Sequence, residues 1–389
     1  MVEKRAAVIE DDVARLRFVR RSIAKHAMTA ACRAHQETMA ARQSSRRKLE
    51  RLLRASVITL VAMLVFLPEL PRSLRATTAT SPHTVPPTTL PAPAAPTVWL
   101  VEEKAPLEIY SNGLHIDATF LTSTRNRNYR TFDRVTWRAQ ATRQTPAGIV
   151  FHTTESQVAP FDSSENARLK RNGRQLLVFA ARNHLYHFLI DRFGRVFRVV
   201  AETDYANHAG NSVWADPDHI YWGLNQGFIG VAFEAQTDSG STGAADTATP
   251  AQMNSARLLT ELLRSKYGIS ASNCVTHAQV SINLQTMRLG YHTDWAANFP
   301  FREIGLEDGY DMPVAALALF GFDYDSAFLR ANGGRVWKGL VLSDEQLLRQ
   351  AAANGATFDG YRHMLQRKYR EWKHREAGLA TDDASGDRR

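Results

Sequence analysis

Gly148-Ile-Val-Phe-His-Thr-Thr-Glu-Ser156 is an apolar run that ends in a histidine and continues into polar residues. A short apolar run of this length predicts a buried strand, with His152 at its end. His277 likewise follows a short predicted strand, Cys274-Val-Thr276, and Asp294 lies in a loop shortly afterwards. Two imidazoles and one carboxylate are a suitable ligand set for catalytic zinc, with one coordination position left open.

Spacing alone is weak support for a metal site, because the chain has 13 histidines. The segments around His152 add a mixed pattern. We predict a helix over Glu165–Asn183, a hairpin over Tyr186–Val200, a buried strand over Phe228–Ala235 and a helix from Thr249-Pro250 to Gly268. The fold class predicted is therefore α/β (mixed), with a mostly mixed central β-sheet flanked by helices rather than a simple doubly wound sheet.

The order of these local patterns resembles the zinc-dependent N-acetylmuramoyl-L-alanine amidases, which share their fold with phage lysozyme-type amidases and peptidoglycan-recognition proteins. The resemblance covers about residues 148–302. Beyond Gly148–Ser156, it is carried by Tyr186-His-Phe-Leu-Ile-Asp-Arg-Phe-Gly-Arg-Val196, Asn207-His-Ala-Gly210, Phe228-Ile-Gly-Val-Ala-Phe-Glu234, the helix Ala251–Tyr267, Thr276-His-Ala-Gln-Val-Ser281 and the Asp294 loop.

The resemblance implies that His152, His277 and Asp294 bind Zn²⁺. One branch of the family uses a catalytic Glu at the place where this chain has Ala232, and the other branch uses a Tyr where this chain has Tyr186. The resemblance therefore implies that Tyr186 is catalytic. The family often has Lys two residues before the third ligand. His292 stands there, and we expect it to assist catalysis.

Two further residues are candidates for substrate binding. His208 precedes Ala-Gly and either contacts substrate or holds a turn; Glu155 contacts substrate, supports a zinc-binding imidazole or faces water. Glu234 shares a strand face with Ala232, because side chains alternate along a strand. It is either a substitute base or part of an ion pair at the strand end.

The basic charge of the chain is concentrated at its N-terminus. The net charge is +9, but residues 1–54 hold 14 Lys and Arg against 6 Asp and Glu, which leaves the other 335 residues nearly neutral. A nucleic-acid-binding domain carries its basic excess on the folded part. We therefore expect no nucleic-acid partner.

An apolar run at residues 55–70 follows this basic block and precedes a linker rich in Pro and Thr. The run is short for a membrane span, for which about 20 residues are usual, and a buried helix is the alternative. The basic flank favours a single-pass inner-membrane anchor with a cytoplasmic N-terminus. The catalytic domain would then be periplasmic or otherwise extracytoplasmic.

The C-terminal part of the chain is predicted to be helical from about Met312, and it includes a capping box, Ser343-Asp-Glu-Gln346. The predicted organisation of the chain has seven parts. They are a basic cytoplasmic helical segment (1–54), a transmembrane anchor (55–70), a Pro/Thr-rich linker (71–97), a β-rich segment (98–145), the zinc amidase domain (146–302), a helical C-terminal extension (303–375) and a disordered tail (376–389).

The function expected from the resemblance is zinc-dependent hydrolysis of the amide bond between N-acetylmuramic acid and L-alanine in peptidoglycan. Peptidoglycan and muropeptides are the expected partners. A non-catalytic muropeptide sensor of the same fold is the main alternative, because His292 replaces the usual Lys. A membrane scaffold driven by residues 1–54 is a third possibility.

Overall fold

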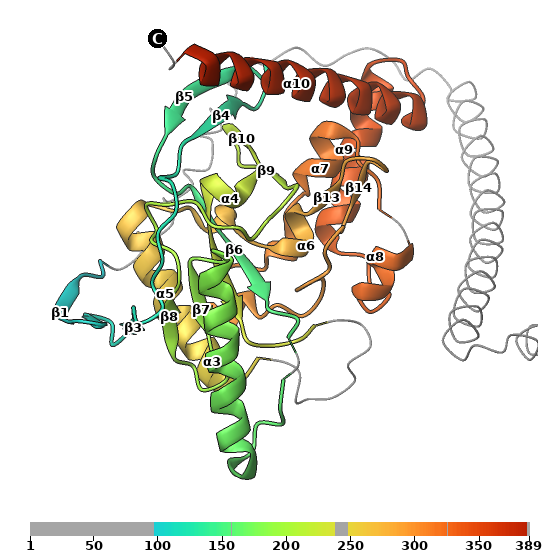
Figure 1. The fold of residues 1–389 in the computed structure, drawn as a ribbon. Coiled ribbons are helices and arrows are strands. Elements are labelled where there is room, and N and C mark those ends of the chain that lie inside the picture. Colours follow the sequence, from blue (N-terminus) through green and yellow to red (C-terminus); the bar gives the residue numbers. More distant parts are fainter. Residues whose placement is uncertain (1–96, 157, 238–247, 325, 387–389) are drawn as a thin grey trace, which may run out of the picture. The chain divides into compact units, whose positions relative to one another are not determined.

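The computed structural model describes residues 97–386 apart from position 157, residues 238–247 and position 325 (Figure 1). The predicted cytoplasmic segment 1–54, the anchor 55–70 and nearly all of the linker lie outside these ranges. Within them, no helix has both the length and the apolar character that crossing a bilayer requires.

The largest sheet has eight strands in the order β1-β2-β3-β8-β7-β11-β6-β12. β6, β7, β11 and β12 run parallel to one another, whereas β8 pairs antiparallel with β7. The mixed sheet and the predicted hairpin are thus confirmed. Its strands are β1 (Leu100–Lys104), β2 (Leu107–Tyr110), β3 (His115–Asp117), β6 (Gly148–Thr153), β7 (Phe188–Ile190), β8 (Val196–Arg198), β11 (Phe228–Phe233) and β12 (Cys274–Thr276).

Two smaller sheets complete the strands. The four-stranded sheet has the order β5-β4-β10-β9, and the third is a two-stranded ribbon. Their strands are β4 (Tyr129–Asp133), β5 (Ala139–Arg143), β9 (Val213–Ala215), β10 (His219–Trp222), β13 (Ile282–Asn283) and β14 (Arg288–Leu289).

The β-rich segment 98–145 shares both larger sheets with the amidase segment 146–302. β3 pairs with β8 through Ile116 and Val196, and β4 pairs with β10 through Phe132 and Ile220. The boundary that we drew between residues 145 and 146 therefore divides both sheets. Local sequence patterns predicted that residues 98–145 form strands. They contain no information on which strands, about 80 residues away, pair with them.

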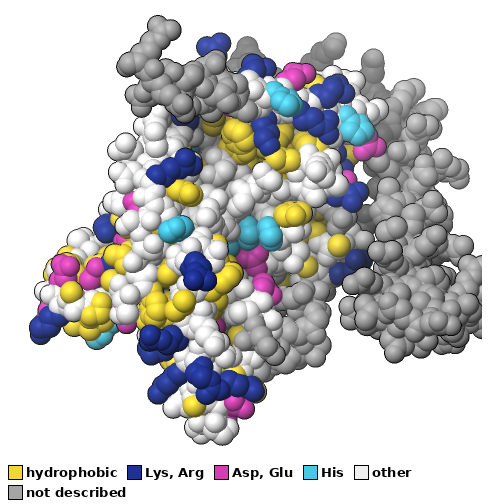
Figure 2. All heavy atoms as spheres, viewed as in Figure 1, with side chains coloured by type: hydrophobic (Ala, Val, Ile, Leu, Met, Phe, Trp, Pro, Cys, Tyr) yellow, Lys and Arg dark blue, Asp and Glu magenta, His cyan; other side chains and the backbone are white. Residues whose placement is uncertain are grey.

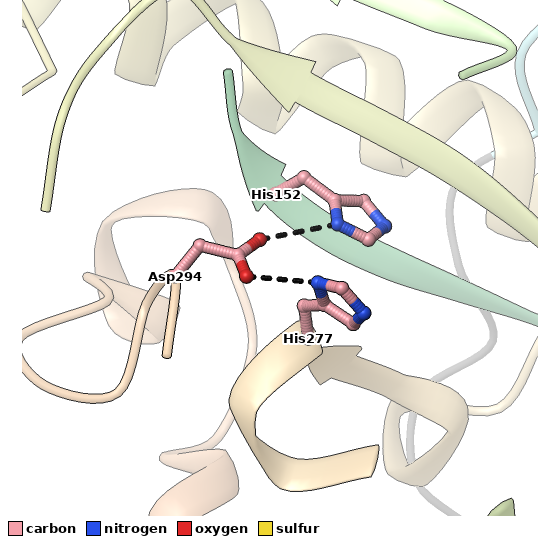
Figure 3. Close-up of side chains that lie close together, drawn as sticks. All are labelled: His152, His277 and Asp294. Atoms are coloured by element: carbon pink, nitrogen blue, oxygen red, sulfur yellow. Dashed lines mark hydrogen bonds and ion pairs between the residues drawn. The ribbon is translucent and has the colours of Figure 1, made fainter. Parts of the chain in front are cut away.

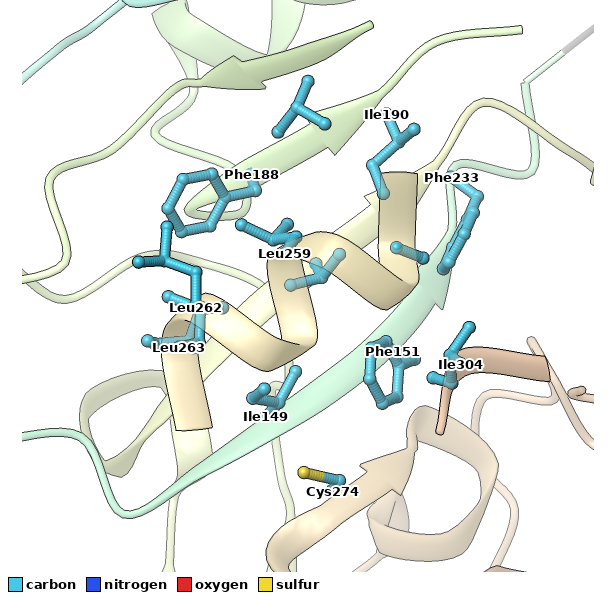
Figure 4. Close-up of a cluster of buried hydrophobic side chains, with 14 of the residues drawn as sticks. Ile149, Phe151, Phe188, Ile190, Phe233, Leu259, Leu262, Leu263, Cys274 and Ile304 are labelled. Atoms are coloured by element: carbon cyan, nitrogen blue, oxygen red, sulfur yellow. The ribbon is translucent and has the colours of Figure 1, made fainter. Parts of the chain in front are cut away.

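Helix α5 (Pro250–Tyr267) covers one face of the large sheet (Figure 4). Thr249 and Gln252 form a capping box at its start, and Gly268 ends it with a left-handed φ of 65°. Phe151 and Leu259 belong to the core beneath this helix. Because alternate residues of a strand face opposite ways, this contact directs the side chain of His152 to the other face.

The other face of the sheet is partly covered by helix α3 (Asn166–Arg182). Leu177 and Ala180 of α3 pack with Leu189 and Val199 in a separate core. Between them, α3 and α5 bury the strands that carry the predicted site residues. The shorter helices next to these strands are α4 (Leu224–Gly227) and α6 (His277–Val280).

The C-terminal helices pack against the four-stranded sheet, as Figure 1 shows for α10 beside β4 and β5. Trp372 of α10 contacts the rings of Phe132, Trp137 and Phe320. The predicted helical extension is thus also part of the folded core. Its helices are α7 (Ala315–Phe320), α8 (Ser326–Ala331), α9 (Lys338–Ala353) and α10 (Phe358–Gly386).

Two details of this region differ from the sequence prediction. Ser343 lies inside α9 rather than at its start, because its hydroxyl accepts a hydrogen bond from Val314 N (2.8 Å) and donates to Gly339 O (2.7 Å). A tertiary contact thus replaces the predicted cap. α10 continues to Gly386, past Arg375, through residues that include the good helix formers Leu and Ala.

Candidate active site

The two histidines of the predicted metal site lie at adjacent strand ends. His152 is the penultimate residue of β6, and His277 is the first residue of α6, directly after β12. Because β6 and β12 are parallel neighbours, their carboxyl ends lie at the same edge of the sheet. Asp294 reaches this edge from a loop, where its carbonyl accepts a hydrogen bond from Ala278 N (3.3 Å).

The three side chains converge, as Figure 3 shows. One carboxylate oxygen of Asp294 lies 3.2 Å from Nδ1 of His152, and the other lies 2.8 Å from Nδ1 of His277. All three residues are buried, with exposed fractions of 1 %, 5 % and 9 % for His152, His277 and Asp294. The three ligand atoms lie within 4.8 Å of one another.

Burial and mutual contact hold two of these groups in the protonation states that a cation requires. Burial, followed by the neighbouring charge of His277, lowers the pKa of His152 to about 4. Burial would raise the pKa of Asp294, but the charge of His277 and the hydrogen bonds from both histidines outweigh burial and lower it. A neutral imidazole and an ionised carboxylate are the forms that bind metals.

A second group in the described part of the chain, Asp216, Asp218 and His219, is also compact enough to hold a metal. Its contacts have a structural explanation. The oxygens of Asp216 accept hydrogen bonds from Tyr221 OH and from the backbone of its own turn, and Arg143 contacts Nε2 of His219 at 2.9 Å. An arginine at this position disfavours a cation, so this group is not a second candidate.

The structure places both predicted catalytic residues beside the histidines. The ring of Tyr186 lies 5.2 Å from that of His152, and its backbone is left-handed, with φ 56°. Burial, then the charges of Asp294 and Glu155, raise the pKa of Tyr186, so its hydroxyl stays protonated at neutral pH. The ring of His292 stacks on that of His277 at 4.8 Å, with its side chain exposed.

The structure brings one of the two predicted substrate-binding residues against a metal-site residue. Nδ1 of His208 lies 3.1 Å from Nε2 of His152. Glu155 instead accepts hydrogen bonds from N and Oγ1 of Thr237, both at 3.0 Å, and Thr237 Oγ1 accepts one from Trp295 N at 3.1 Å. Glu155 therefore supports the loop that carries Asp294. No local sequence pattern pointed to Thr237.

Histidine and acidic side chains lie side by side near the middle of the face drawn in Figure 2. In the site region, His292 and Glu155 are exposed. A cavity of about 390 Å³ lies elsewhere, between the β2–β3 hairpin, β8 and α5. β8 is three strands away from β6 in the sheet. The convergent histidines and carboxylate, not this cavity, define the candidate site.

Glu234 lies beside helix α3, with its carboxylate next to Gly173. Its carboxylate accepts a hydrogen bond from Arg192 N (3.2 Å), and an added Cβ on Gly173 would lie 3.2 Å from it. Its side chain is only 2 % exposed. Its contacts with Arg192 N and with helix α3 favour a structural role. Burial raises the pKa of Glu234 from 4.5 to about 7.

We expect this shift to make stability depend on pH. Between pH 4.5 and about 7 the folded protein keeps a proton on Glu234 that the unfolded chain releases. The free energy of unfolding should therefore fall with rising pH in that window, by at most about 3 kcal/mol from this group. Urea denaturation of Glu234→Gln should lack this decline. The exposed Glu303→Gln should retain it, and a parallel pH dependence in wild type and Glu234→Gln would contradict the assignment.

A family model matches the segment that carries this site. Residues 142–294 match the family model described as N-acetylmuramoyl-L-alanine amidase. A search of the curated proteins gave no match. Among solved structures, the chain is similar to the amidase LysC from Clostridium intestinale URNW, with 21 % identity, 47 % of this chain and 93 % of that chain covered, and a TM-score of 0.26.

Two other solved structures are similar. One is the E. coli amidase AmiD in complex with anhydro-N-acetylmuramic acid-L-Ala-D-γ-Glu-L-Lys, with 20 % identity, coverage of 53 % and 88 %, and a TM-score of 0.35. The other is AmpDh3 from Pseudomonas aeruginosa, with 22 % identity, coverage of 44 % and 64 %, and a TM-score of 0.29. The matched segment contains all three converging residues, and the chain therefore carries, over residues 142–294, a domain of the N-acetylmuramoyl-L-alanine amidase family.

Proposed function

We propose that this protein is a zinc-dependent hydrolase that cleaves the amide bond between N-acetylmuramic acid and L-alanine in peptidoglycan. The observation that carries the proposal is the convergence of His152, His277 and Asp294 at one sheet edge within the amidase segment. We infer the substrate class from the family, and we infer the metal from the chemistry of these three side chains.

The three residues fit zinc in chemistry and in spacing. Ligand atoms about 2.0–2.1 Å from a tetrahedral ion lie about 3.3 Å from one another. The two Asp294-to-imidazole distances of 3.2 and 2.8 Å are close to that value. Among the described residues, Nε2 of His277 is buried and has no hydrogen-bond partner, whereas its Nδ1 contacts Asp294. Two imidazoles and one carboxylate leave a fourth position open, as catalytic zinc sites do.

A zinc ion held by these residues would polarise the scissile carbonyl and lower the pKa of a bound water. The chain itself supplies two further groups. The protonated hydroxyl of Tyr186 can donate a hydrogen bond to the carbonyl oxygen, on which negative charge develops as water adds to the carbon. This contact strengthens in the transition state and thus raises kcat.

His292 provides a second polar group near the metal site, on the outer side of His277. Partial desolvation beside His277, followed by the charge of His277, lowers the pKa of His292, so its ring is neutral at pH 7. A neutral imidazole has one donor and one acceptor nitrogen, so it can accept a proton from water and return it to the amide nitrogen as the C–N bond breaks. This group differs from a permanently charged Lys in supplying no fixed positive charge.

We further propose that residues 55–70 anchor the protein in the inner membrane with the amidase domain on the outer side. The apolar run, the basic residues before it and the Pro/Thr-rich linker after it support this proposal. About 20 linker residues in a polyproline-like conformation would reach roughly 60 Å. That reach would suit an enzyme whose substrate is a distant insoluble polymer.

Removal of the metal is the direct test of the function. Treatment of the full-length protein with a chelator should reduce the release of stem peptides from muropeptides to background, and added Zn²⁺ should restore it. Mass spectrometry of the digest measures the released peptides, and metal analysis of the untreated protein measures its zinc content. Stem-peptide release that is insensitive to the chelator would contradict zinc dependence. A protein that contains no zinc and releases no peptides would instead be a muropeptide sensor.

A further inference from the structure

His208 touches the far side of the metal-site residue His152. Nδ1 of His208 lies 3.1 Å from Nε2 of His152, the ring nitrogen that faces away from Asp294. The other ring nitrogen of His208, Nε2, lies 3.3 Å from the backbone carbonyl oxygen of Phe228. Four groups therefore form a chain in space: the Phe228 carbonyl, His208, His152 and the Asp294 carboxylate.

The chemistry of these groups fixes the direction of the hydrogen bonds. A carbonyl oxygen only accepts, so Nε2 of His208 must carry a proton to bond to it. The neutral form of His208, with its single proton on Nε2, satisfies this contact and leaves Nδ1 without a proton. Its Nδ1 then has a lone pair and accepts a proton from Nε2 of His152.

This hydrogen bond also determines the state of the other ring nitrogen of His152, Nδ1. A neutral imidazole with its proton on Nε2 has a lone pair on Nδ1, and Nδ1 is the atom that faces Asp294. Without a metal, the Asp294 carboxylate attracts a proton to this same Nδ1. The two contacts therefore act against each other on His152, and a cation bound at Nδ1 satisfies both.

We propose that His208 is a positioning residue that holds His152 in the tautomer with the proton on Nε2, so that Nδ1 is free to bind the metal. The inference rests on the proposed zinc site. It assigns His208 a role through His152 rather than a direct contact with substrate.

The surrounding structure holds His208 in this position. A Cβ on Gly230 would lie 2.6 Å from Cγ of His208, so only glycine in β11 leaves room for the imidazole. Oδ1 of Asn225 accepts hydrogen bonds from the backbone N–H groups of His208 (3.0 Å) and Ala209 (2.6 Å). These contacts fix both the ring and the turn that carries it.

The other histidine of the site lacks such a partner. Nε2 of His277 is buried and has no hydrogen-bond partner among the described residues. The tautomer control is therefore specific to His152, and loss of His208 should weaken metal binding without removing a ligand.

Two substitutions separate this role from a structural one. The amide of His208→Gln keeps an acceptor for His152 and a donor for Phe228, whereas His208→Leu keeps neither. In the full-length protein, we expect His208→Leu to bind Co²⁺ and Zn²⁺ about 10–100-fold more weakly, and His208→Gln to stay within a few-fold of wild type. Visible absorption of the Co²⁺ form and competition with a chelator measure the affinities. His184→Leu, at a half-buried histidine that contacts Thr122, is the matched control and should leave them unchanged.

Nuclear magnetic resonance of the zinc-loaded, ¹⁵N-histidine-labelled protein tests the tautomer directly. The proton should be attached to Nε2 of His152, with a coupling across the hydrogen bond to Nδ1 of His208. A proton on Nδ1 of His208, or equal metal affinities for the Leu and Gln variants, would overturn the inference while leaving the zinc site intact. A wild-type protein that binds neither ion would instead overturn the proposed function, and this inference with it.

Discussion

Asp294→Ala is expected to abolish metal binding and to lower kcat/KM for muropeptide hydrolysis by at least about 1,000-fold, or about 4 kcal/mol of transition-state stabilisation. Asp294 is the only anionic group among the three converging residues, and each of its oxygens faces one imidazole. Its removal takes away one ligand and the shared acceptor of the other two. Metal analysis and the release of stem peptides measure the two effects.

A control variant distinguishes this effect from a general loss of acidic charge. Asp218 belongs to the other compact group of histidine and carboxylates and is exposed. Asp218→Ala should keep full metal content and activity, because Asp216 in that group bonds to its own turn and to Tyr221. Normal cellular function of Asp294→Ala would favour a membrane scaffold, and normal hydrolysis by the purified variant would refute the assignment of this residue.

Tyr186→Phe should lower kcat by about 100- to 1,000-fold while leaving KM and zinc content nearly unchanged. The hydroxyl stays protonated because burial and the nearby charges of Asp294 and Glu155 raise its pKa. It therefore acts as a hydrogen-bond donor rather than as a base, and its contribution should persist from pH 6 to 9. Steady-state kinetics across this pH range, with metal analysis of the same samples, measure the effect.

The choice of control matters because other tyrosines also lie near the sheet. The ring of Tyr205 lies 4.7 Å from the guanidinium of Arg125, and the residue is half-buried. Tyr205→Phe should behave as wild type. A Tyr186→Phe variant that loses zinc would show that the hydroxyl supports the structure of the site. A variant with unchanged kcat would show that the reaction does not use the Tyr186 hydroxyl as a donor.

Local sequence patterns were sufficient for the elements that form the site. The apolar run before His152, the turn at Asp191–Gly194 and the cap at Thr249-Pro250 each mark an element that the structure contains. These signals are local, because strand burial, turn formation and helix capping depend on residues a few positions apart. The order of the motifs also identified the amidase family, since the matched segment spans residues 142–294.

The roles of individual residues depended on distant contacts. Nothing local to His208 showed that it would meet His152 under a glycine from β11, and nothing local to Glu155 showed that it would brace the Asp294 loop through Thr237. The strands of residues 98–145 likewise found their partners only in the folded sheet. Hydrogen-bond partners far apart in the chain are selected by packing, so the sequence alone determined the elements and the chemistry, whereas the tertiary structure decided which side chains act together.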